Sequence, residues 1–494
     1  MRIGSFSLNS DNEVIVKVVR EVLNLFKLEI TQEQPEYKAL QVQNEVLPTQ
    51  PVSVRTEVRL WPPGDGEPVT ELLEQQAQAD EHEKAAIHRL VKLNLYYLLR
   101  KILQLPQAPW GILHGVRPTK IVHRFLQTGM SAEQVEARLA QDYDVSPQKS
   151  RLLTDLAVLQ QPFLATHNAK LVSVYVGIPF CLTRCLYCSF PSHLLPKQEV
   201  LDRFMAVLHR DLTAAKAELV RYGLQVQSIY IGGGTPTSLP DEYFARMVDE
   251  VYRTFYDEQT IEFTVEAGRP DSISEAKIRT MADYHVSRVS VNPQTMQERT
   301  LQLIGRRHTP QDIVQMYHAL KDAGIPSINM DLIIGLPGET TADVRDTMAQ
   351  LAELAPDDIT LHALALKRGS YLKENIANIA LPSDEEAREM FAVAMDAIYS
   401  WGMRPYYLYR QGYQIGQLEN VGCCRPGGES IYNIQIMEER QTVIGIGGSA
   451  TSKVVNQKDY RLKSAFNAKE LSVYLDRIDF YIEKRAALFR EAYG

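Results

Sequence analysis

Residues 174–192, VYVGIPFCLTRCLYCSFPS, hold three of the chain's five cysteines within eight positions: Cys181, Cys185 and Cys188. The apolar, β-branched run before them predicts a buried strand that ends at the cysteines. A four-iron, four-sulfur cluster takes one thiolate per iron, so spacings of three and two residues let one short loop ligate three corners of a single cube. The fourth iron then stays open to a small ligand.

Two other interpretations of these cysteines are open. A structural zinc site needs a fourth protein ligand, and His193 follows five positions after Cys188. Three buried thiols without a metal are the other alternative, because free cysteine is commonly buried. Pro179 and Pro191 bracket the loop at the end of a predicted strand, which makes purely structural thiols the weaker interpretation.

Composition narrows the class of protein. The chain has 494 residues, 45% hydrophobic and 23% charged, which is typical of a soluble globular protein with a sizeable core. The formal net charge of -8 argues against a nucleic-acid-binding protein or one that coats an anionic membrane. We find no apolar run long enough to span a bilayer and no signal peptide, so we expect a cytoplasmic protein. Thiols stay reduced there, which favours metal or redox chemistry over disulfides.

Between about residue 169 and residue 370, short apolar runs alternate with amphipathic helical stretches. Six strand–helix repeats predict an α/β fold, with a parallel sheet curled into a full or partial TIM-like (β/α)6 barrel. Such barrels carry their chemistry in the loops that follow the C-terminal ends of the strands. The predicted strands cover residues 171–178, 226–233, 261–267, 288–294, 327–335 and 358–364.

Residues 1–168 lack cysteine and any recognisable cofactor motif. Residues 12–30 have helical periodicity, residues 52–61 alternate like a strand, and residues 82–103 form a long helix with an apolar face. We therefore predict a mixed α/β accessory domain at the N-terminus.

Residues 371–494 predict a C-terminal α+β region that contributes to substrate binding or forms a lid. A helix begins in the Ser-Asp-Glu-Glu run at residue 383 and ends at Gly402. The stretch 430–451, SIYNIQIMEERQTVIGIGGSAT, reads as a strand, a turn and a second strand, and the end of the chain is helical.

Polar and glycine-rich motifs follow the predicted barrel strands. GGGTPT, residues 232–237, lets the backbone approach a ligand closely and offers amide donors, although a tight strand-to-helix turn would look the same. Glu266 and Gln294 stand at the ends of the third and fourth strands. Asp331 lies inside the otherwise apolar fifth strand, where a carboxylate without a partner is costly, so it is functional or part of a structural ion pair.

These motifs carry a family resemblance. Cys-x3-Cys-x2-Cys, with Tyr187 before its last cysteine, resembles the signature of the radical S-adenosylmethionine (SAM) superfamily. The first 168 residues and residues 419–445 resemble the longer HemZ type of the oxygen-independent coproporphyrinogen III oxidase (dehydrogenase) family. In chain order, the strings that resemble this family are YVGIPFC, GGGTPTSL, EAGRPD, GRRHT, DLIIGLPGET and GIGGSA, within roughly residues 170–455.

The resemblance implies a radical SAM core over residues 169–370 and a [4Fe-4S] cluster on the cysteines. In this family the open iron chelates SAM, and an electron from the cluster cleaves SAM into methionine and a 5′-deoxyadenosyl radical. It also implies a tetrapyrrole substrate, coproporphyrinogen III, whose two propionates become vinyl groups, and an electron donor protein. The residues implied to contact SAM or lie beside it are Tyr175, Gly233, Gly234, Thr235, Glu266, Gln294, Arg306 and Asp331.

The chain departs from the best-studied enzymes of the family at two positions. Phe190 replaces a fourth cysteine and Gly177 replaces a histidine, which puts a second bound SAM in doubt. CLYCSF also resembles haem-chaperone relatives, but their His-Asn-x-x-Tyr-Trp element is absent from the C-terminal half, where residues 429–437 read ESIYNIQIM. A haem-handling protein and a radical SAM methyltransferase that opens haem remain alternatives.

The substrate's carboxylates would need basic partners, for which arginine is best suited. The candidates by position are Arg184, Arg307, Lys367, Arg368 and Arg410, together with Arg117 and Lys120 in the accessory domain, and most of these are expected to be surface charges. The adjacent Cys423 and Cys424 are interpreted as buried small residues rather than as an electron relay.

Overall fold

The computed structural model describes the whole chain except residues 1, 10–12, 27, 31–37, 65, 114, 166–168, 366–369, 375–379, 413 and 457–460. The chain divides into two compact units, Met1–Asp155 and Leu156–Gly494. The predicted boundaries at residues 168 and 370 stay predictions. Among the helices of the described ranges, none is both long enough and apolar enough to cross a membrane.

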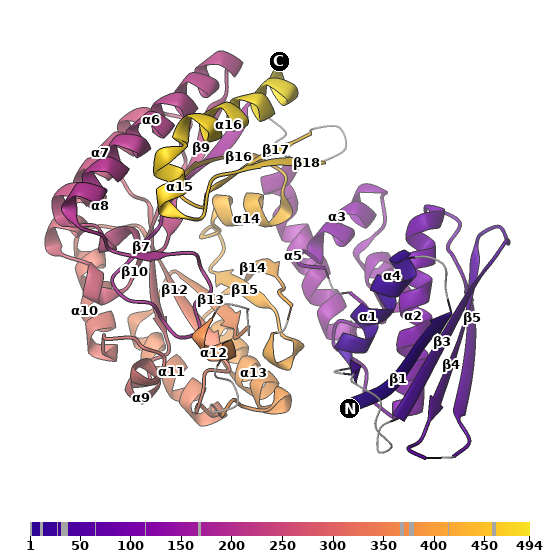
Figure 1. The fold of residues 1–494 in the computed structure, drawn as a ribbon. Helices are drawn as coiled ribbons and strands as arrows, with labels where there is room; N and C mark the ends of the chain where they lie inside the picture. The colour runs from indigo at the N-terminus through magenta and orange to yellow at the C-terminus, as the bar shows by residue number, and fades with distance from the viewer. Residues whose placement is uncertain are drawn as a thin grey trace. The chain divides into compact units, whose positions relative to one another are not determined.

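The first unit contains a five-stranded sheet in the order β2-β1-β3-β4-β5. Its strands are β1 (Arg2–Asn9), β2 (Glu29–Ile30), β3 (Lys38–Leu47), β4 (Ser53–Trp61) and β5 (Val69–Gln76). The helices α1 (Glu13–Leu25) and α2 (Glu83–Leu103) pack together over one face of this sheet (Figure 1). The predicted strand and both predicted helices are therefore confirmed.

Three further helices follow α2: α3 (Thr119–Gln127), α4 (Ala132–Tyr143) and α5 (Pro147–Ala165). Helix α4 begins with a capping box, in which the side chains of Ser131 and Gln134 each accept a hydrogen bond from the other residue's backbone N–H. Helix α5 runs across the division between the units, and Gln160 on its second half donates from Nε2 to the backbone oxygen of Tyr406 at 3.0 Å.

The second unit is built on one 11-stranded sheet in the order β14-β15-β13-β12-β11-β10-β9-β6-β16-β17-β18. Its central six strands are parallel and follow the chain order, which is the arrangement of a partial (β/α)6 barrel. All six predicted strands are confirmed. They are β6 (Leu171–Ile178), β9 (Gln225–Gly233), β10 (Glu262–Gly268), β11 (Arg288–Gln294), β12 (Ser327–Ile334) and β13 (Asp358–Ala363).

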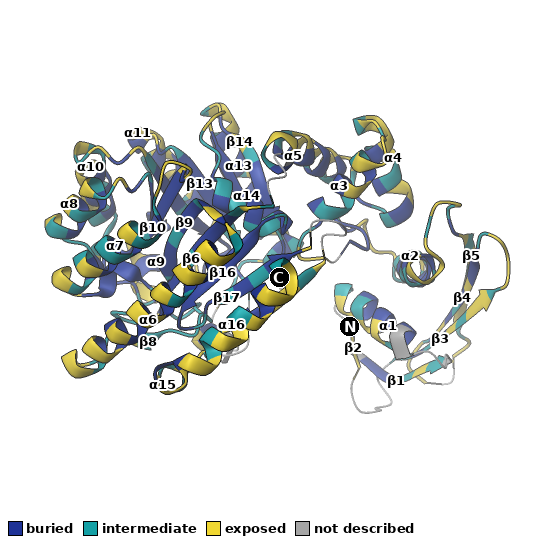
Figure 2. Ribbon diagram, turned by 90° about the horizontal axis from the view of Figure 1, so that it is seen from above, coloured by how far each residue is buried: buried dark blue, intermediate teal, exposed yellow. Residues whose placement is uncertain are grey.

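Helices connect these strands and surround the sheet (Figure 1). Glycine or a side-chain cap marks many of their ends: α6 stops at Gly223 in a left-handed conformation, and Thr309 caps α10. In Figure 2 the strands are buried while the outer sides of the helices are exposed. The connecting helices are α6 (Gln198–Tyr222), α7 (Asp241–Phe255), α8 (Glu275–Asp283), α9 (Glu298–Leu303), α10 (Pro310–Asp322) and α11 (Thr341–Leu354), with the short helices η1 (Pro236–Ser238) and η2 (Pro270–Ser272).

The C-terminal segment extends the same sheet at both edges. Strand β16 (Thr442–Gly447) lies parallel to β6, so it adds a seventh parallel strand beside the cysteine loop. Strand β15 (Asn420–Cys424) pairs antiparallel with β13 at the other edge. The remaining elements are α12 (Tyr371–Glu374), α13 (Asp384–Ser400), β14 (Arg404–Tyr409), η4 (Ile415–Gln417), β17 (Thr451–Val455), β18 (Leu462–Phe466), α15 (Leu471–Asp476) and α16 (Ile478–Tyr493).

One prediction in this segment is wrong. The first strand expected within residues 430–451 is the helix α14 (Ile431–Glu438), and only the second expected strand is present, as β16. The buried carboxylate of Glu262 accepts hydrogen bonds from the backbone N–H of Ile431 at 2.7 Å and from Ser430 Oγ at 2.8 Å. A tertiary contact thus caps the helix and overrides the β-branched pattern.

Candidate functional site

The three cysteines lie in a loop at the C-terminal end of β6, the first barrel strand. The short strand β7 (Phe180–Cys181) pairs with β8 (His193–Leu194), and the backbone N–H of Leu195 donates to the carbonyl of Cys181 at 3.1 Å. Cys185 is 8% exposed, while Cys181 and Cys188 are half-buried. Burial raises the pKa of the Cys188 thiol, and the nearby Cys185 and Cys181 raise it further.

His193 is placed by the same small sheet. Its Nε2 lies 3.3 Å from the backbone oxygen of Lys469. Within the described ranges, no three His, Cys, Asp or Glu side chains are grouped so as to hold one metal ion. The same finding covers the three cysteines, so their assignment to one cluster rests on their spacing in the chain.

The glycine triplet packs directly against the cysteine loop. Gly233 has φ of 116°, a conformation that favours glycine, and a Cβ on Gly234 would lie 2.4 Å from the Phe180 oxygen and 3.0 Å from Cys181 Sγ. The backbone N–H of Thr235 donates to the same Phe180 oxygen at 2.7 Å, and its hydroxyl lies 3.7 Å from Cys181 Sγ. Only glycine at position 234 lets the backbone lie this close to Phe180 and Cys181.

Glu266 on β10 is held by the neighbouring strand β9. Its carboxylate accepts hydrogen bonds from Tyr230 Oη at 2.6 Å and from the backbone N–H of Gly233 at 3.1 Å. Burial raises the pKa of Glu266 to about 7. Tyr175 lies on the same layer of the sheet, paired in register with Tyr230, and their rings stack with centroids 6.0 Å apart.

Gln294 and Arg306 are buried, and each carries a polar atom without a hydrogen-bond partner in the described part of the chain. Gln294 ends β11 with φ of 69°, and its Oε1 has no hydrogen-bond partner among the described residues. Arg306 donates from Nη2 to Tyr187 Oη at 2.7 Å and from Nη1 to the Gly268 oxygen at 3.4 Å, while its buried Nε is unpaired within the described ranges. Arg306 touches the cysteine loop at Tyr187, and an unsatisfied buried polar atom there is what a polar ligand would pair.

The donor set therefore fits a cluster with SAM. Three thiols lie in one loop, a glycine backbone lies against the first of them, and unpaired polar groups and a carboxylate gather on the adjoining strand ends. Cys181, Cys185 and Cys188 would hold the cluster. The predicted SAM residues from β6, β9, β10, β11 and β12 all belong to one continuous sheet.

Asp331 has partners that the sequence reasoning missed. Its Oδ1 accepts from Asn329 Nδ2 at 2.7 Å, and its Oδ2 lies 3.6 Å from His362 Nε2 on the adjacent strand β13. Tyr409 Oη lies 3.2 Å from the other ring nitrogen of His362. The sequence does contain a signal for these partners. Ser327, Asn329 and Asp331 alternate along one strand and Asp358, Thr360 and His362 along the next, and alternate residues of a strand share a face.

The inner face of the sheet is polar along its whole depth. Ser173 bonds Ser228 at 2.7 Å, Asn329 donates to Ser290 at 3.1 Å, and Thr360 donates to the Asn329 side-chain oxygen at 3.0 Å. The alternate residues, such as Val265, Val289 and Met330, face the helices in one apolar core.

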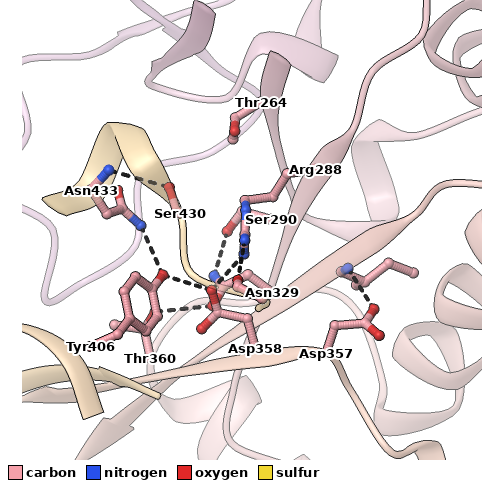
Figure 3. Close-up of polar contacts among 12 residues, drawn as sticks. Thr264, Arg288, Ser290, Asn329, Asp357, Asp358, Thr360, Tyr406, Ser430 and Asn433 are labelled. Atoms are coloured by element: carbon pink, nitrogen blue, oxygen red, sulfur yellow. Dashed lines mark hydrogen bonds and ion pairs between the residues drawn. The ribbon is translucent and has the colours of Figure 1, made fainter. Parts of the chain in front are cut away.

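A buried ion pair lies on this face at the N-terminal end of the strands. Figure 3 shows Arg288 directed at Asp358, with an Nη1–Oδ2 distance of 2.5 Å, and Tyr406 Oη donating to the same carboxylate at 2.7 Å. Asn433 on α14 donates to Tyr406 Oη at 3.4 Å. These side chains thus pair with one another at the N-terminal end of the strands, opposite the end that carries the cysteine loop.

His308 is a second residue that the sequence reasoning did not single out, although it stands in the quoted GRRHT string. It is 4% exposed, and neither ring nitrogen has a hydrogen-bond partner among the described residues. Burial, together with the neighbouring charge of Arg306, lowers its pKa to about 4, so the ring is neutral at pH 7.

The cations proposed to bind the substrate carboxylates differ in burial and in the unit to which they belong. Arg184 and Arg307 are exposed, Lys367 and Arg368 lie outside the described residues, and Arg117 and Lys120 belong to the first unit. Arg410 is 9% exposed, and burial lowers its pKa to about 10. Cys423 and Cys424 are 0% exposed in β15, as expected of buried small residues.

The sequence of this chain is similar to a family model and to proteins of known name. Residues 175–351 match the family model described as the radical SAM superfamily. The oxygen-independent coproporphyrinogen-III oxidase-like protein HemZ of Bacillus subtilis is 40% identical over 414 residues, covering 82% of both chains. The heme chaperone HemW of Lactococcus lactis is 31% identical over 281 residues, 56% of this chain and 69% of HemW.

A solved structure supports the fold. Coproporphyrinogen III oxidase (HemN) from Escherichia coli, described as a radical SAM enzyme, matches with a TM-score of 0.53 and 23% identity, over 66% of this chain and 72% of that one.

Proposed function

The chain belongs to the radical SAM superfamily, in the family of HemZ and related oxygen-independent coproporphyrinogen-III oxidase-like proteins, and from this membership we propose that it catalyses oxidative decarboxylation of coproporphyrinogen III. Proteins of this superfamily use a [4Fe-4S] cluster and SAM, and the cysteine motif for the cluster is present at Cys181, Cys185 and Cys188. When bound, the cluster and SAM supply a 5′-deoxyadenosyl radical.

The proposed reaction converts two propionate side chains to vinyl groups. Each conversion transfers one hydrogen atom to the adenosyl radical, releases carbon dioxide and passes one electron to an acceptor. The product is protoporphyrinogen IX, and we propose that an electron donor protein of the cytoplasm reduces the cluster beforehand.

One observation carries the proposal: Gly233, Glu266 and Gln294, three of the residues expected to bind SAM, stand at or near the C-terminal ends of the adjacent strands β9, β10 and β11. Strand β9 also pairs with β6, which leads into the cysteine loop. The Glu266 carboxylate accepts a hydrogen bond from the backbone N–H of Gly233 in the glycine loop. At the end of the next strand, Gln294 Oε1 has no partner among the residues that the structure describes. In this role Glu266 would accept hydrogen bonds from hydroxyl or ammonium groups of SAM, and Gln294, Arg306 and Asp331 would contact SAM as well. The fixed sheet keeps these groups aligned, as a reactive radical requires.

The test is anaerobic incubation of the reconstituted protein with SAM, a reductant and coproporphyrinogen III. We expect 5′-deoxyadenosine together with a tetrapyrrole that has lost two carboxyl groups, identified by mass. Cys185→Ala is the matched control, because it removes one cluster ligand and leaves the substrate side unchanged. Formation of 5′-deoxyadenosine without any decarboxylated tetrapyrrole would reject coproporphyrinogen III as the substrate.

A second candidate function is haem handling, favoured by the 31% identity to the heme chaperone HemW. It predicts stoichiometric haem binding by the reconstituted protein and no decarboxylated product. A haem-opening methyltransferase would instead release S-adenosylhomocysteine alongside 5′-deoxyadenosine. The same incubation, repeated with haem and followed by absorbance and mass, separates the three outcomes.

A further inference from the structure

Arg269 connects the loop after β10 to the cysteine loop. Its residue exposure is 3%, and it lies three positions after Glu266. Nη1 donates to both oxygens of Thr183, at 3.1 Å to the backbone carbonyl and 2.7 Å to Oγ1. Thr183 stands midway between Cys181 and Cys185, so this contact holds the part of the loop that separates two of the cluster ligands.

Asp271 fixes the orientation of the Arg269 guanidinium. Nε lies 2.9 Å from Oδ1 and Nη2 lies 2.8 Å from Oδ2, a bidentate pair in which both donors share one plane. The third nitrogen is thereby aimed at Thr183. Lysine carries one compact ammonium and cannot form the paired contact and the loop contact in the same geometry.

Other contacts hold the two ends of the loop. The backbone N–H of Leu195 donates to the Cys181 carbonyl at 3.1 Å, and the backbone N–H of Leu186 donates to the Ile304 carbonyl at 3.1 Å. Arg269 adds a contact at the middle, and it does so from the same strand end that presents Glu266. The position of the cluster loop is therefore tied to the position of a SAM-binding carboxylate.

We propose that Arg269 is a positioning residue that sets the separation between the cluster loop and Glu266, so that SAM reaches the open iron and the strand end together. The role follows from Arg269, Asp271 and Thr183 and does not rest on the tetrapyrrole reaction. Ligation of the cluster stays with the three cysteines. Loss of Arg269 should therefore impair the response of the cluster to SAM more than the cluster content.

The test compares Arg269→Gln, Arg269→Lys and Thr183→Val with the parent after anaerobic reconstitution. Iron and sulfide are measured for each protein, and the reduced cluster is examined by electron paramagnetic resonance as SAM is added. We expect near-parental iron and sulfide, while the spectral change needs about tenfold more SAM in both Arg269 variants. A role that needs only positive charge would be rescued by lysine, and that result would overturn the proposal.

Thr183→Val keeps the proposal testable if the Arg269 variants fold poorly, because it removes one hydroxyl and no charge. It leaves the carbonyl contact intact, so we expect a shift of about threefold in the SAM titration. In the double variant with Arg269→Gln, the valine should not shift the SAM titration further, since both changes remove the same contact between Arg269 Nη1 and Thr183 Oγ1.

Arg279→Gln is the control, because Arg279 is an exposed arginine, 71% accessible, on the next helix. It should match the parent in every measurement. A parental spectral response and a parental SAM titration in the folded Arg269→Gln and Thr183→Val proteins would show that the contact is structural only.

Discussion

Asp331 and His362 face each other across two neighbouring barrel strands, with Oδ2 of the carboxylate 3.6 Å from Nε2 of the ring. Their strands pair in parallel register, so both side chains lie on the polar inner face of the sheet near its C-terminal end. Asn329 and Tyr409 complete the contacts around them. The predicted SAM residue Asp331 is therefore part of a polar group that reaches the last barrel strand.

Replacing this carboxylate should affect SAM more than the fold. Asp331→Asn removes the negative charge, but its amide oxygen can still accept from Asn329. We expect SAM to bind about tenfold more weakly because a charge-assisted hydrogen bond is lost. Equilibrium dialysis of the reconstituted variant measures the affinity, and thermal unfolding of the apo protein checks the fold. Equal SAM affinity in variant and parent would refute the assigned role.

The cluster should depend on Cys185 and not on the cysteines of β15. Cys185→Ala should lose most of the iron and sulfide and all SAM cleavage, with the secondary structure preserved, because the loop and not the core is changed. Cys423→Ala is the matched control, since Cys423 is fully buried in the core. Iron, sulfide and 5′-deoxyadenosine are measured in both. Cleavage at the parental rate by Cys185→Ala contradicts the ligand assignment.

SAM binding should strengthen as the pH rises through neutrality. Burial raises the Glu266 pKa to about 7, so the carboxyl is largely protonated at pH 6 and ionised at pH 8. The ionised form is the better acceptor, and we expect a several-fold tighter SAM dissociation constant at pH 8, up to about tenfold per pH unit for one coupled proton. A titration series from pH 6 to 8 measures the change. In Glu266→Gln the part of the pH dependence that is due to this residue should vanish.

The Glu266 carboxyl should affect the folding stability of the apo protein in the opposite direction: SAM affinity rises with pH, whereas the contribution of this carboxyl to stability falls. The folded pKa of about 7 exceeds the ordinary value of 4.5, so the folded apo protein binds more protons than the unfolded chain between these pH values. Its contribution to stability is therefore lost as the pH rises from about 4.5 to about 7. The difference in melting temperature between the parent and Glu266→Gln, followed across this range, should change in that direction.

Breaking the buried ion pair should destabilise the second unit strongly. Arg288→Ala leaves the Asp358 carboxylate, whose side chain is 1% exposed, without its cation, and the expected loss is about 3–5 kcal/mol. Denaturant unfolding monitored by far-UV circular dichroism measures it. Arg279→Ala, at an exposed pair, serves as the control and should leave the midpoint unchanged. An unchanged midpoint in Arg288→Ala would mean that the pair contributes little.

Much of the barrel could be read from the chain because its signals are local. Alternating apolar and helical runs located all six parallel strands, and the motifs at their ends named Glu266, Gln294 and Asp331. The stretch 431–438 was misread because its β-branched residues are typical of strands. The carboxylate that caps this helix belongs to Glu262 on strand β10, which is 169 positions away from Ile431 in the sequence.

The sequence by itself determined the cysteine spacing, the succession of strands and helices along the barrel segment and the glycine loop, since each depends on residues close together in the chain. Only the tertiary structure decided the partners: His362 near Asp331 on the adjacent strand, Arg269 bonded to Thr183, and Arg288 paired with Asp358. The physical reason is that polar groups taken out of water must find partners on neighbouring strands, and the folding of the sheet selects which ones come within reach.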